Sequence, residues 1–502
     1  MNRRIGWTGL LLLACSAGPW AAADDGAPPA DGPPPEFQQR WRRPDPETKA
    51  SAFRHLDPER SSSLPPIYEG FAYRHWLVRG GAAEAAARIP EGPLRAQVRL
   101  DLLTHGEDAV REGLAYALAL APLEGDGEAL AGAVSDRDPL VRRDAARGLR
   151  HLPSRGALKA LVRQLAREAD ARPRVWILDA LRALVRADLG PDPAPWQAWW
   201  EAHRDDLLLQ APVDLPPEKG EFAGVRLETV TIPARDPDAG RRRPWLFVLA
   251  PFGWTHDYFR PHLDLLGEIF TVAYIRLPSV KELTGSEGYG DSIPVYPADR
   301  LARAFEALRK QKGVEQVILL AEGPAAWIAE DYALMNPSRT AGLILLNGWV
   351  DSASYAEALK RMAARGNDEE RAAARSLLGV DPSRRDQAEE RWMERTTLTH
   401  RLMDRADLLG HLLWTRTRDP QGFASVPPVV FTRQVKIEAP ALFVFPAASP
   451  LSGHPEAERI RESFPRSIVA TLDDTRGLGF VDRHDEFHRI VRGFVERFRL
   501  DR

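Results

Sequence analysis

The stretch that decides the fold of the second half of the chain is residues 317–326, VILLAEGPAA. It opens with a continuous apolar run, the pattern of a strand buried on both faces of a parallel sheet. Glu322, Gly323 and Pro324 end the run, and an alanine-rich segment suited to a helix follows at 325–335. The stretch therefore predicts a buried strand that turns sharply into a helix.

The same alternation of apolar runs and helical segments continues from about residue 221 to residue 500, with helices expected at 298–312 and 325–335. It predicts a mostly parallel sheet with helices on both faces. Residues 351 to about 435 interrupt the rhythm with charged helical sequence, which we expect to be an inserted lid. The predicted strands are 224–232, 244–250, 270–276, 316–320, 342–346, 441–445 and 467–472.

Three phrases give residues 221–500 a resemblance to a known family: GYGDS at 288–292, the stretch at 317–326, and Asn336-Pro337 leading to LILLNG at 343–348. This part of the chain resembles the α/β-hydrolase superfamily, in its lid-bearing subgroup of esterases, dehalogenases and epoxide hydrolases. The resemblance implies an α/β-hydrolase fold with a helical lid, and a nucleophile at a sharp turn after the central strand.

The turn departs from the family at the positions that carry chemistry. Ala321 and Ala325 supply the small residues of the small-x-nucleophile-x-small pattern, but the nucleophile position is Gly323, which has no side chain. The next backbone N–H normally helps to hold the oxyanion, and here that residue is Pro324, which has none. Pro251 falls in the phrase at 250–253 that usually supplies the second donor. We expect a degenerate nucleophile elbow.

The acid and the base implied by the resemblance are also missing. Ser449 stands where the family carries its acid, and residues 474–480 contain no histidine. Other groups offer an alternative, an active hydrolase with relocated catalytic residues. The candidates are Glu322, Asp351, and the pair His484 and His488. Each also has a structural interpretation, which we favour. Glu322 would be a carboxylate that stabilises a helix N-terminus, Asp351 a surface residue at the start of the lid, and the two histidines part of a solvated helix face.

The first half of the chain is helical in pattern from about residue 67 to residue 208. A phrase at 136–142, DRDPLVR, opens an Ala/Leu-rich helix, and similar phrases lie about 31 residues earlier and about 34 residues later. This period resembles HEAT-like repeats, stacked helix pairs that bury each other's apolar faces. Trp196, Trp199, Trp200 and His203 lie on the last helix, where we expect a core-filling cap rather than an aromatic binding face.

The N-terminus has the features of an export signal at 1–23, with Arg3 and Arg4 before a short apolar run. Ordinary cleavage after the alanines at 21–23 competes with lipidation of Cys15, which ends a lipobox-like Leu-Leu-Ala-Cys. We expect an exported, periplasmic or cell-envelope protein, either released or lipid-anchored through Cys15. Residues 24–66 are Pro-rich and predict a disordered linker, and residues 209–220 predict a second linker.

Composition narrows the range of functions. Among 502 residues, 68 basic and 71 acidic side chains give a net charge of −3, without the basic stripe that nucleic-acid binding requires. No phosphate-binding glycine loop or strong metal signature occurs, so we expect no cofactor and no metal. We expect a non-catalytic protein that binds a protein partner or an apolar small molecule. The alternatives are the active hydrolase and a HEAT-repeat interaction scaffold.

Overall fold

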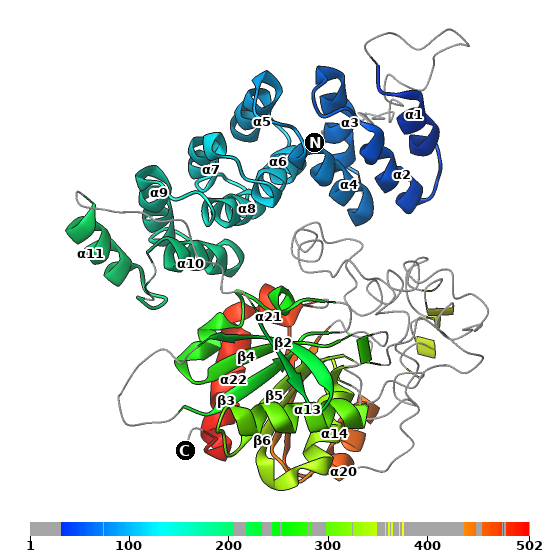
Figure 1. Ribbon diagram of the computed structural model, residues 1–502, viewed down its shortest axis with the longest axis vertical. Coiled ribbons are helices and arrows are strands. Elements are labelled where there is room, and N and C mark those ends of the chain that lie inside the picture. Colours follow the sequence, from blue (N-terminus) through cyan, green and yellow to red (C-terminus); the bar gives the residue numbers. More distant parts are fainter. Residues whose placement is uncertain are drawn as a thin grey trace, which may run out of the picture.

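The computed structural model describes two parts of the chain, a helical N-terminal region and an α/β unit (Figure 1). The described residues are 32–204, 217–232, 243–278, 282–283, 298–348, 436–447 and 454–500, with scattered residues between 357 and 375. Short gaps within these ranges are 74, 186, 188, 252–253, 324, 474 and 476–477. Cys15, Asp351 and Ser449, most of the predicted lid and the signal segment lie outside the described residues.

The N-terminal region is a stack of helices in two layers (Figure 1). Helices α2, α4, α6, α8 and α10 pack side by side in one layer, and α5, α7, α9 and α11 form the other; consecutive helices pair across the layers. The helices are α1 Pro35–Trp41, α2 Pro46–Ala52, α3 Leu64–Phe71, α4 Trp76–Ala87, α5 Pro93–Thr104, α6 Asp108–Leu120, α7 Gly127–Ala133, α8 Pro139–Leu149, α9 Arg155–Leu165, α10 Ala171–Val185 and α11 Pro193–His203, with short 3₁₀ turns at Phe53–His55, Ser61–Ser63 and Glu124–Asp126.

Local sequence explains where several of these helices begin. The Asp138 carboxylate accepts hydrogen bonds from the backbone N–H groups of Leu140 and Val141, and Pro139 occupies the first turn of α8, where a missing N–H costs nothing. Ser154 caps α9 in the same way through the N–H of Ala157. Where α6 passes α3, Gly113 lies so close to the ring of Phe71 that a Cβ atom there would collide with it.

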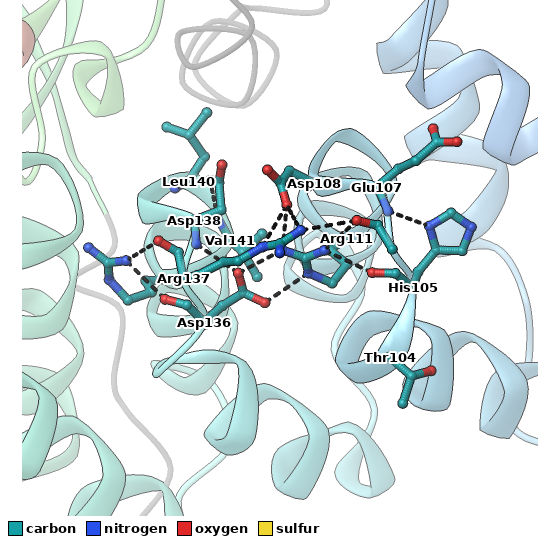
Figure 2. A network of polar contacts seen from close by, with 12 residues as sticks. Thr104, His105, Glu107, Asp108, Arg111, Asp136, Arg137, Asp138, Leu140 and Val141 are labelled. Carbon is teal, nitrogen blue, oxygen red and sulfur yellow. Dashed lines mark hydrogen bonds and ion pairs between the residues drawn. The ribbon is translucent and has the colours of Figure 1, made fainter.

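A ladder of arginine side chains joins successive helix pairs of the stack (Figure 2). Arg111 donates to both oxygens of Asp136, at 2.9 and 3.0 Å, and also to the carboxylate of Asp108 at 2.7 Å. One unit later, Arg142 makes the equivalent two-pronged pair with Glu168, at 2.7 and 2.8 Å. Each arginine also bonds the carbonyl of the residue six positions before it. The ladder therefore fixes the register between neighbouring units.

The prediction of a disordered linker over 24–66 is wrong for its described part. Helices occupy residues 35–41, 46–52 and 64–71, and the Phe37 and Phe53 rings are buried in the same core as the rest of the stack. Trp41 packs edge-on against Phe53 at 5.6 Å. These aromatic side chains supply the burial that the proline-rich composition of the segment concealed.

The α/β unit is built on one eight-stranded sheet in the order β1-β2-β4-β3-β5-β6-β7-β8. β2 pairs antiparallel with β1 and with β4, and the remaining neighbours are parallel. This mostly parallel sheet is consistent with the α/β-hydrolase fold. The strands are β1 Glu218–Phe222, β2 Val225–Ile232, β3 Trp245–Leu249, β4 Thr271–Arg276, β5 Val317–Glu322, β6 Thr340–Leu346, β7 Ala441–Pro446 and β8 Ser467–Leu472.

The seven predicted strands are all present, and β1 is an addition within and beyond the predicted 209–220 linker. Alternate side chains of the central strands enter two separate cores, one on each face of the sheet. Helices α13 Ala298–Gln311, α14 Ala325–Met335 and α20 His454–Ser463 cover one face, and α21 Gly479–Asp482 and α22 His484–Phe498 cover the other. Within the described ranges, no helix is both long enough and apolar enough to cross a bilayer.

Candidate functional site

The sharp turn predicted after the central strand is present at Gly323. The backbone of Gly323 is left-handed, with φ +55°, and its N–H donates to the carbonyl of Leu346 at the end of β6, at 2.8 Å. The N–H of Ala326 then bonds the Gly323 carbonyl at 3.0 Å as α14 begins. A left-handed residue between a strand and a helix is the backbone form of a nucleophile elbow, and glycine adopts it without strain.

The space in front of Gly323 would admit a side chain. Apart from Gly323 itself and its two chain neighbours, no atom of the described residues lies within 4 Å of the position that a Cβ atom would occupy there. The turn therefore keeps the shape and the room of an elbow, while the residue at its tip carries no attacking atom. Pro324 lies outside the described residues, but its ring nitrogen bears no hydrogen whatever its conformation.

The second expected oxyanion position is also occupied by a proline. Pro251 follows β3, and its carbonyl accepts the N–H of Trp254 at 3.1 Å. The N–H of Ala250, just before it, is used within the sheet edge, where it donates to the carbonyl of Ile275 at 3.0 Å. Phe252 and Gly253, the rest of the phrase, lie outside the described residues. In the described part of this loop, the backbone N–H groups of Ala250 and Trp254 therefore already donate hydrogen bonds within the fold.

Glu322, at the last position of β5, is buried at the same edge of the sheet, with 1% of its surface exposed. Its carboxyl group accepts the side-chain N–H of Asn347 at 2.9 Å and is hydrogen-bonded to the hydroxyl of Tyr258. Burial raises the pKa of Glu322 to about 7, against the lowering effect of these two hydrogen bonds. The group is therefore close to half protonated near neutral pH, unlike the permanent carboxylate expected at the helix N-terminus.

Asn347, which lies beside Glu322 at the same end of the strands, is a residue of the candidate site that the sequence analysis did not identify. It follows β6 directly, and its backbone is left-handed, with φ +50°, an uncommon conformation that asparagine tolerates better than most residues. Its N–H donates to the carbonyl of Val444 on β7 at 3.1 Å. The signal in the sequence was the polar Asn-Gly pair immediately after the apolar run of 343–346.

The hollow beside Glu322 is small in the part of the chain that the structure describes. Its volume is about 10 Å³, room for about one water molecule. The rings of Phe480 and Phe487 close it from the side of α21 and α22. The lining residues are Glu322, Leu346, Asn347, Val444, Pro446, Leu472, Gly479, Phe480 and Phe487.

The two histidines weighed as relocated bases lie in a separate cluster. His484 and His488 each direct their Nε2 atom at one acceptor, the carbonyl oxygen of His262, at 2.9 and 3.0 Å. A carbonyl only accepts, so both Nε2 atoms carry hydrogen and are not free to act as bases toward Glu322. The expectation of a solvated helix face is wrong for His484, which is 2% exposed because the loop around His262 covers it.

A larger hollow, of about 1180 Å³, lies at the opposite edge of the sheet, where strands β3, β5 and β6 begin. Its described lining combines basic side chains such as Arg466 and Lys436 with apolar ones such as Phe498, and includes no histidine, cysteine or serine. Among the described residues, no group of three or more metal-ligating side chains is arranged to hold a metal ion. The turn at Gly323, with Glu322 and Asn347 beside it, therefore remains the candidate site.

No protein-family model and no curated protein sequence matches this chain. Among solved structures, Cfl2 from Burkholderia cenocepacia is similar at 17% identity over 55% of this chain and 95% of its own, with a TM-score of 0.41. An epoxide hydrolase from Bacillus megaterium is similar at 14% identity over 56% of this chain and 100% of its own, with a TM-score of 0.37. A hydrolase from Pseudomonas aeruginosa is similar at 19% identity over 55% of this chain and 98% of its own, with a TM-score of 0.37.

At these scores the fold assignment rests on the chain's own sheet order, strand directions and elbow. The described structure is thus a helical N-terminal region followed by a mostly parallel sheet consistent with the α/β-hydrolase fold, with glycine at the tip of its elbow.

Proposed function

We propose that this protein is a non-catalytic relative of the α/β hydrolases that binds a partner and does not hydrolyse a substrate. The observation that carries the proposal is the backbone of Gly323, left-handed at the end of β5 with open space before it and no side chain. Acyl transfer and epoxide opening in this fold need a nucleophile at that point and a backbone donor beside it. This chain has glycine and then proline.

The neighbouring polar groups support the same proposal. Glu322 is engaged with Asn347 and Tyr258 in a hollow that admits about one water molecule, which leaves no room there for a substrate among the described residues. The Nε2 atoms of His484 and His488 are committed to the His262 carbonyl. A general base needs a lone pair within hydrogen-bonding reach of the proton that it takes.

In this proposal the helical region is the main binding element. Stacked helix pairs expose an extended surface that other helical-repeat proteins use to bind proteins, and the period of the DxDPxVR phrase supports a HEAT-like stack. The second candidate surface is the one between the elbow and the lid predicted at 351–435, which would have to provide the space for an apolar small molecule, because the described hollow beside Glu322 has a volume of only about 10 Å³. The lipobox-like sequence ending at Cys15 supports export with a lipid anchor in the cell envelope.

Catalytic screening tests the proposal directly. Purified protein is assayed against short-chain p-nitrophenyl esters and against epoxides, together with the variant Glu322→Gln. We expect no turnover above the buffer rate for either protein, because the elbow supplies neither the attacking atom nor the adjacent amide. Robust turnover that disappears in Glu322→Gln would overturn the proposal.

A hydrolase with relocated groups is the second candidate function, and one observation favours it. A pKa of about 7 suits Glu322 to general acid–base work near neutral pH, with Asp351, His484 or His488 as the other groups considered. The same screen separates the two candidates. Pull-down with residues 32–204 and 217–502 expressed separately then distinguishes binding through the helical region alone, the scaffold alternative, from binding that needs both parts.

A further inference from the structure

The hollow of about 1180 Å³ at the edge opposite the Gly323 turn runs along the starts of six parallel strands. In the order of the sheet these strands are β4, β3, β5, β6, β7 and β8. Neighbouring strands lie about 4.8 Å apart, so the six strand starts span about 24 Å. The hollow, which we call the edge trough, is therefore long, and it exceeds the volume of about 300–1,000 Å³ that a small-molecule pocket usually has. Its lining residues at these strand starts are Thr271, Trp245, Gln316, Thr340, Pro440 and Arg466.

The lining of the edge trough is basic. It contains five basic side chains, distributed along its length, and two acidic ones. Two of the basic side chains have acidic partners, because Lys312 pairs with Glu218 at 2.8 Å and Lys436 pairs with Glu438 at 3.4 Å. The excess of positive charge in the trough therefore lies on the arginines.

Three arginines gather around the ring of Phe498 at the β8 end of the trough. The guanidinium of Arg466 lies over the ring, 5.4 Å from its centroid, and that of Arg497 lies 5.9 Å from the same centroid. Arg499 lines the trough together with Phe498 and Arg466. Among the described residues, none of the three arginines has an acidic partner. The β8 end of the trough is therefore a cationic cluster that the described chain does not neutralise.

The end of helix α22 accounts for only part of this charge. Phe498 is the last residue of α22, and a positive charge there is stabilised by the negative end of the helix dipole. That end is equivalent to about half a unit of negative charge, which is far less than the three positive charges around Phe498. Like charges at this spacing repel one another, and an anion between them removes the repulsion. The cluster is therefore suited to bind carboxylates.

Aromatic and aliphatic side chains form much of the rest of the lining. Phe498 and Trp245 lie toward opposite ends of the trough, and each is partly exposed. Val314, Ile437 and Leu500 add aliphatic surface. Arginine and aromatic side chains are enriched where proteins bind one another, whereas the pocket of a small ligand is mostly apolar. The lining therefore resembles a protein-binding surface.

We propose that the edge trough binds an extended acidic segment of a protein partner. Carboxylates of the segment pair with Arg466 and Arg499, since a guanidinium matches a carboxylate with two N–H groups, and its apolar side chains cover Phe498 and Trp245. At about 3.3 Å per residue, about seven extended residues span the trough. This inference rests on the proposed function, because it names the chemistry of the partner, and it places the contact on the α/β unit at the edge opposite Gly323.

Fluorescence polarisation tests the trough with a fluorescein-labelled peptide in which glutamate and leucine alternate over about nine residues, so that its leucines share one face when it is extended. We expect saturable binding to the purified full chain at about 50 mM NaCl, and weaker binding at about 300 mM because salt screens the arginines. The same peptide with lysine in place of glutamate should not bind. If the acidic peptide shows no saturable binding, the proposal is wrong.

Two double variants test whether the arginines of the trough make the contact. Arg466→Gln with Arg499→Gln should weaken peptide binding about tenfold, because two ion pairs are lost. Arg226→Gln with Arg461→Gln is the matched control, since it removes the same charge from two exposed arginines outside the lining. The control should change binding less than about twofold, and an equal loss in both would show unspecific attraction and overturn the proposal. Far-UV circular dichroism establishes that both variants fold.

A small anion is the competing occupant, and sodium dodecanoate tests it. Isothermal titration with dodecanoate is run on the wild-type protein and on both double variants. If dodecanoate binds through the two trough arginines and the acidic peptide does not, the edge trough is a site for an amphipathic small anion and the proposal is wrong. The ester and epoxide screen reports on the Gly323 turn at the other edge of the sheet, so turnover there would end the non-catalytic proposal without changing the peptide result.

Discussion

At the scale of single residues, internal hydrogen bonds hold the turn at Gly323 and the end of the neighbouring strand. Gly323 and Asn347 end adjacent parallel strands, both with a left-handed backbone, and each donates its N–H to the next strand across the sheet. Glu322 lies between them and bonds the Asn347 side chain. The polar groups at this end of the strands therefore bind one another, which supports the proposal of a non-catalytic protein.

The raised pKa of Glu322 gives stability a pH dependence that can be measured. The folded protein holds the proton up to about pH 7, whereas a carboxyl with the ordinary value of 4.5 loses it earlier. This contribution to stability is complete below pH 4.5 and is lost as pH rises through 7. Glu322→Gln keeps a neutral hydrogen-bonding side chain and should gain about 2 kcal/mol over the wild-type protein on going from pH 5 to pH 8.

Urea unfolding at pH 5 and pH 8 measures this difference. Glu315→Gln is the matched control, since Glu315 is an exposed glutamate of the same unit and its replacement makes the same change of side chain outside the core. A Glu322→Gln protein whose advantage does not grow with pH would show that Glu322 is already ionised in the folded protein at pH 5.

At the scale of the elements, the arginine ladder converts a sequence repeat into a fixed helix register. Arg111 is 5% exposed in its side chain and Asp136 12%, so the pair is largely withdrawn from water. Arg137, in the same network, bonds Asp108 at 2.7 Å but is 70% exposed (Figure 2). The two arginines share an acidic partner and differ in burial, which makes them a natural comparison.

We expect Arg111→Gln to destabilise the helical region by about 3 kcal/mol, because it leaves the largely buried carboxylate of Asp136 without its arginine partner. Arg137→Gln should cost about 0.5 kcal/mol or less, since an exposed ion pair contributes little. Urea unfolding followed by circular dichroism at pH 7.5 gives both values. Equal losses of unfolding free energy for the two variants would mean that burial does not determine how much each ion pair of the ladder contributes to stability.

At the scale of the whole molecule, the two units have separate cores. The core of the helical region runs from Phe37 to Trp196, and the two cores of the α/β unit lie on either face of its sheet. Contact between the units is concentrated at α10, α21 and α22 in the described structure. We therefore expect unfolding to proceed in two steps, one for each unit.

Core truncations on each side test this separation. Leu161 on α9 and Phe305 on α13 are both fully buried, each in a different core. Leu161→Ala should lower the transition of the helical region, and Phe305→Ala that of the α/β unit, each by about 6–12 °C. Differential scanning calorimetry at pH 7.5 follows both transitions. If either variant lowers a single common transition, the units unfold as one.

The local sequence pattern was sufficient to predict the elements that are buried on both sides. Strands β5 and β7 and helix α14 lie within two residues of their predicted bounds. Both strands are buried along their whole length, and a strand covered on both faces is a continuous apolar run. The absence of a side chain at Gly323 and of an N–H at Pro324 are covalent facts that the sequence alone determined. The same local reasoning missed β1, whose polar sequence EKGEF is held by its pairing with β2.

Tertiary structure alone decided which distant groups meet. Glu322 and Asn347 are 25 residues apart and come together because β5 and β6 are parallel neighbours in register. His262 and His484 are 222 residues apart, and only the packing of α22 beneath the loop of His262 makes them a cluster. Phe37 and Phe53 are core residues because other helices cover them. The sequence determines which side chains are apolar and which need a polar partner, but the path of the whole chain determines which of them come into contact.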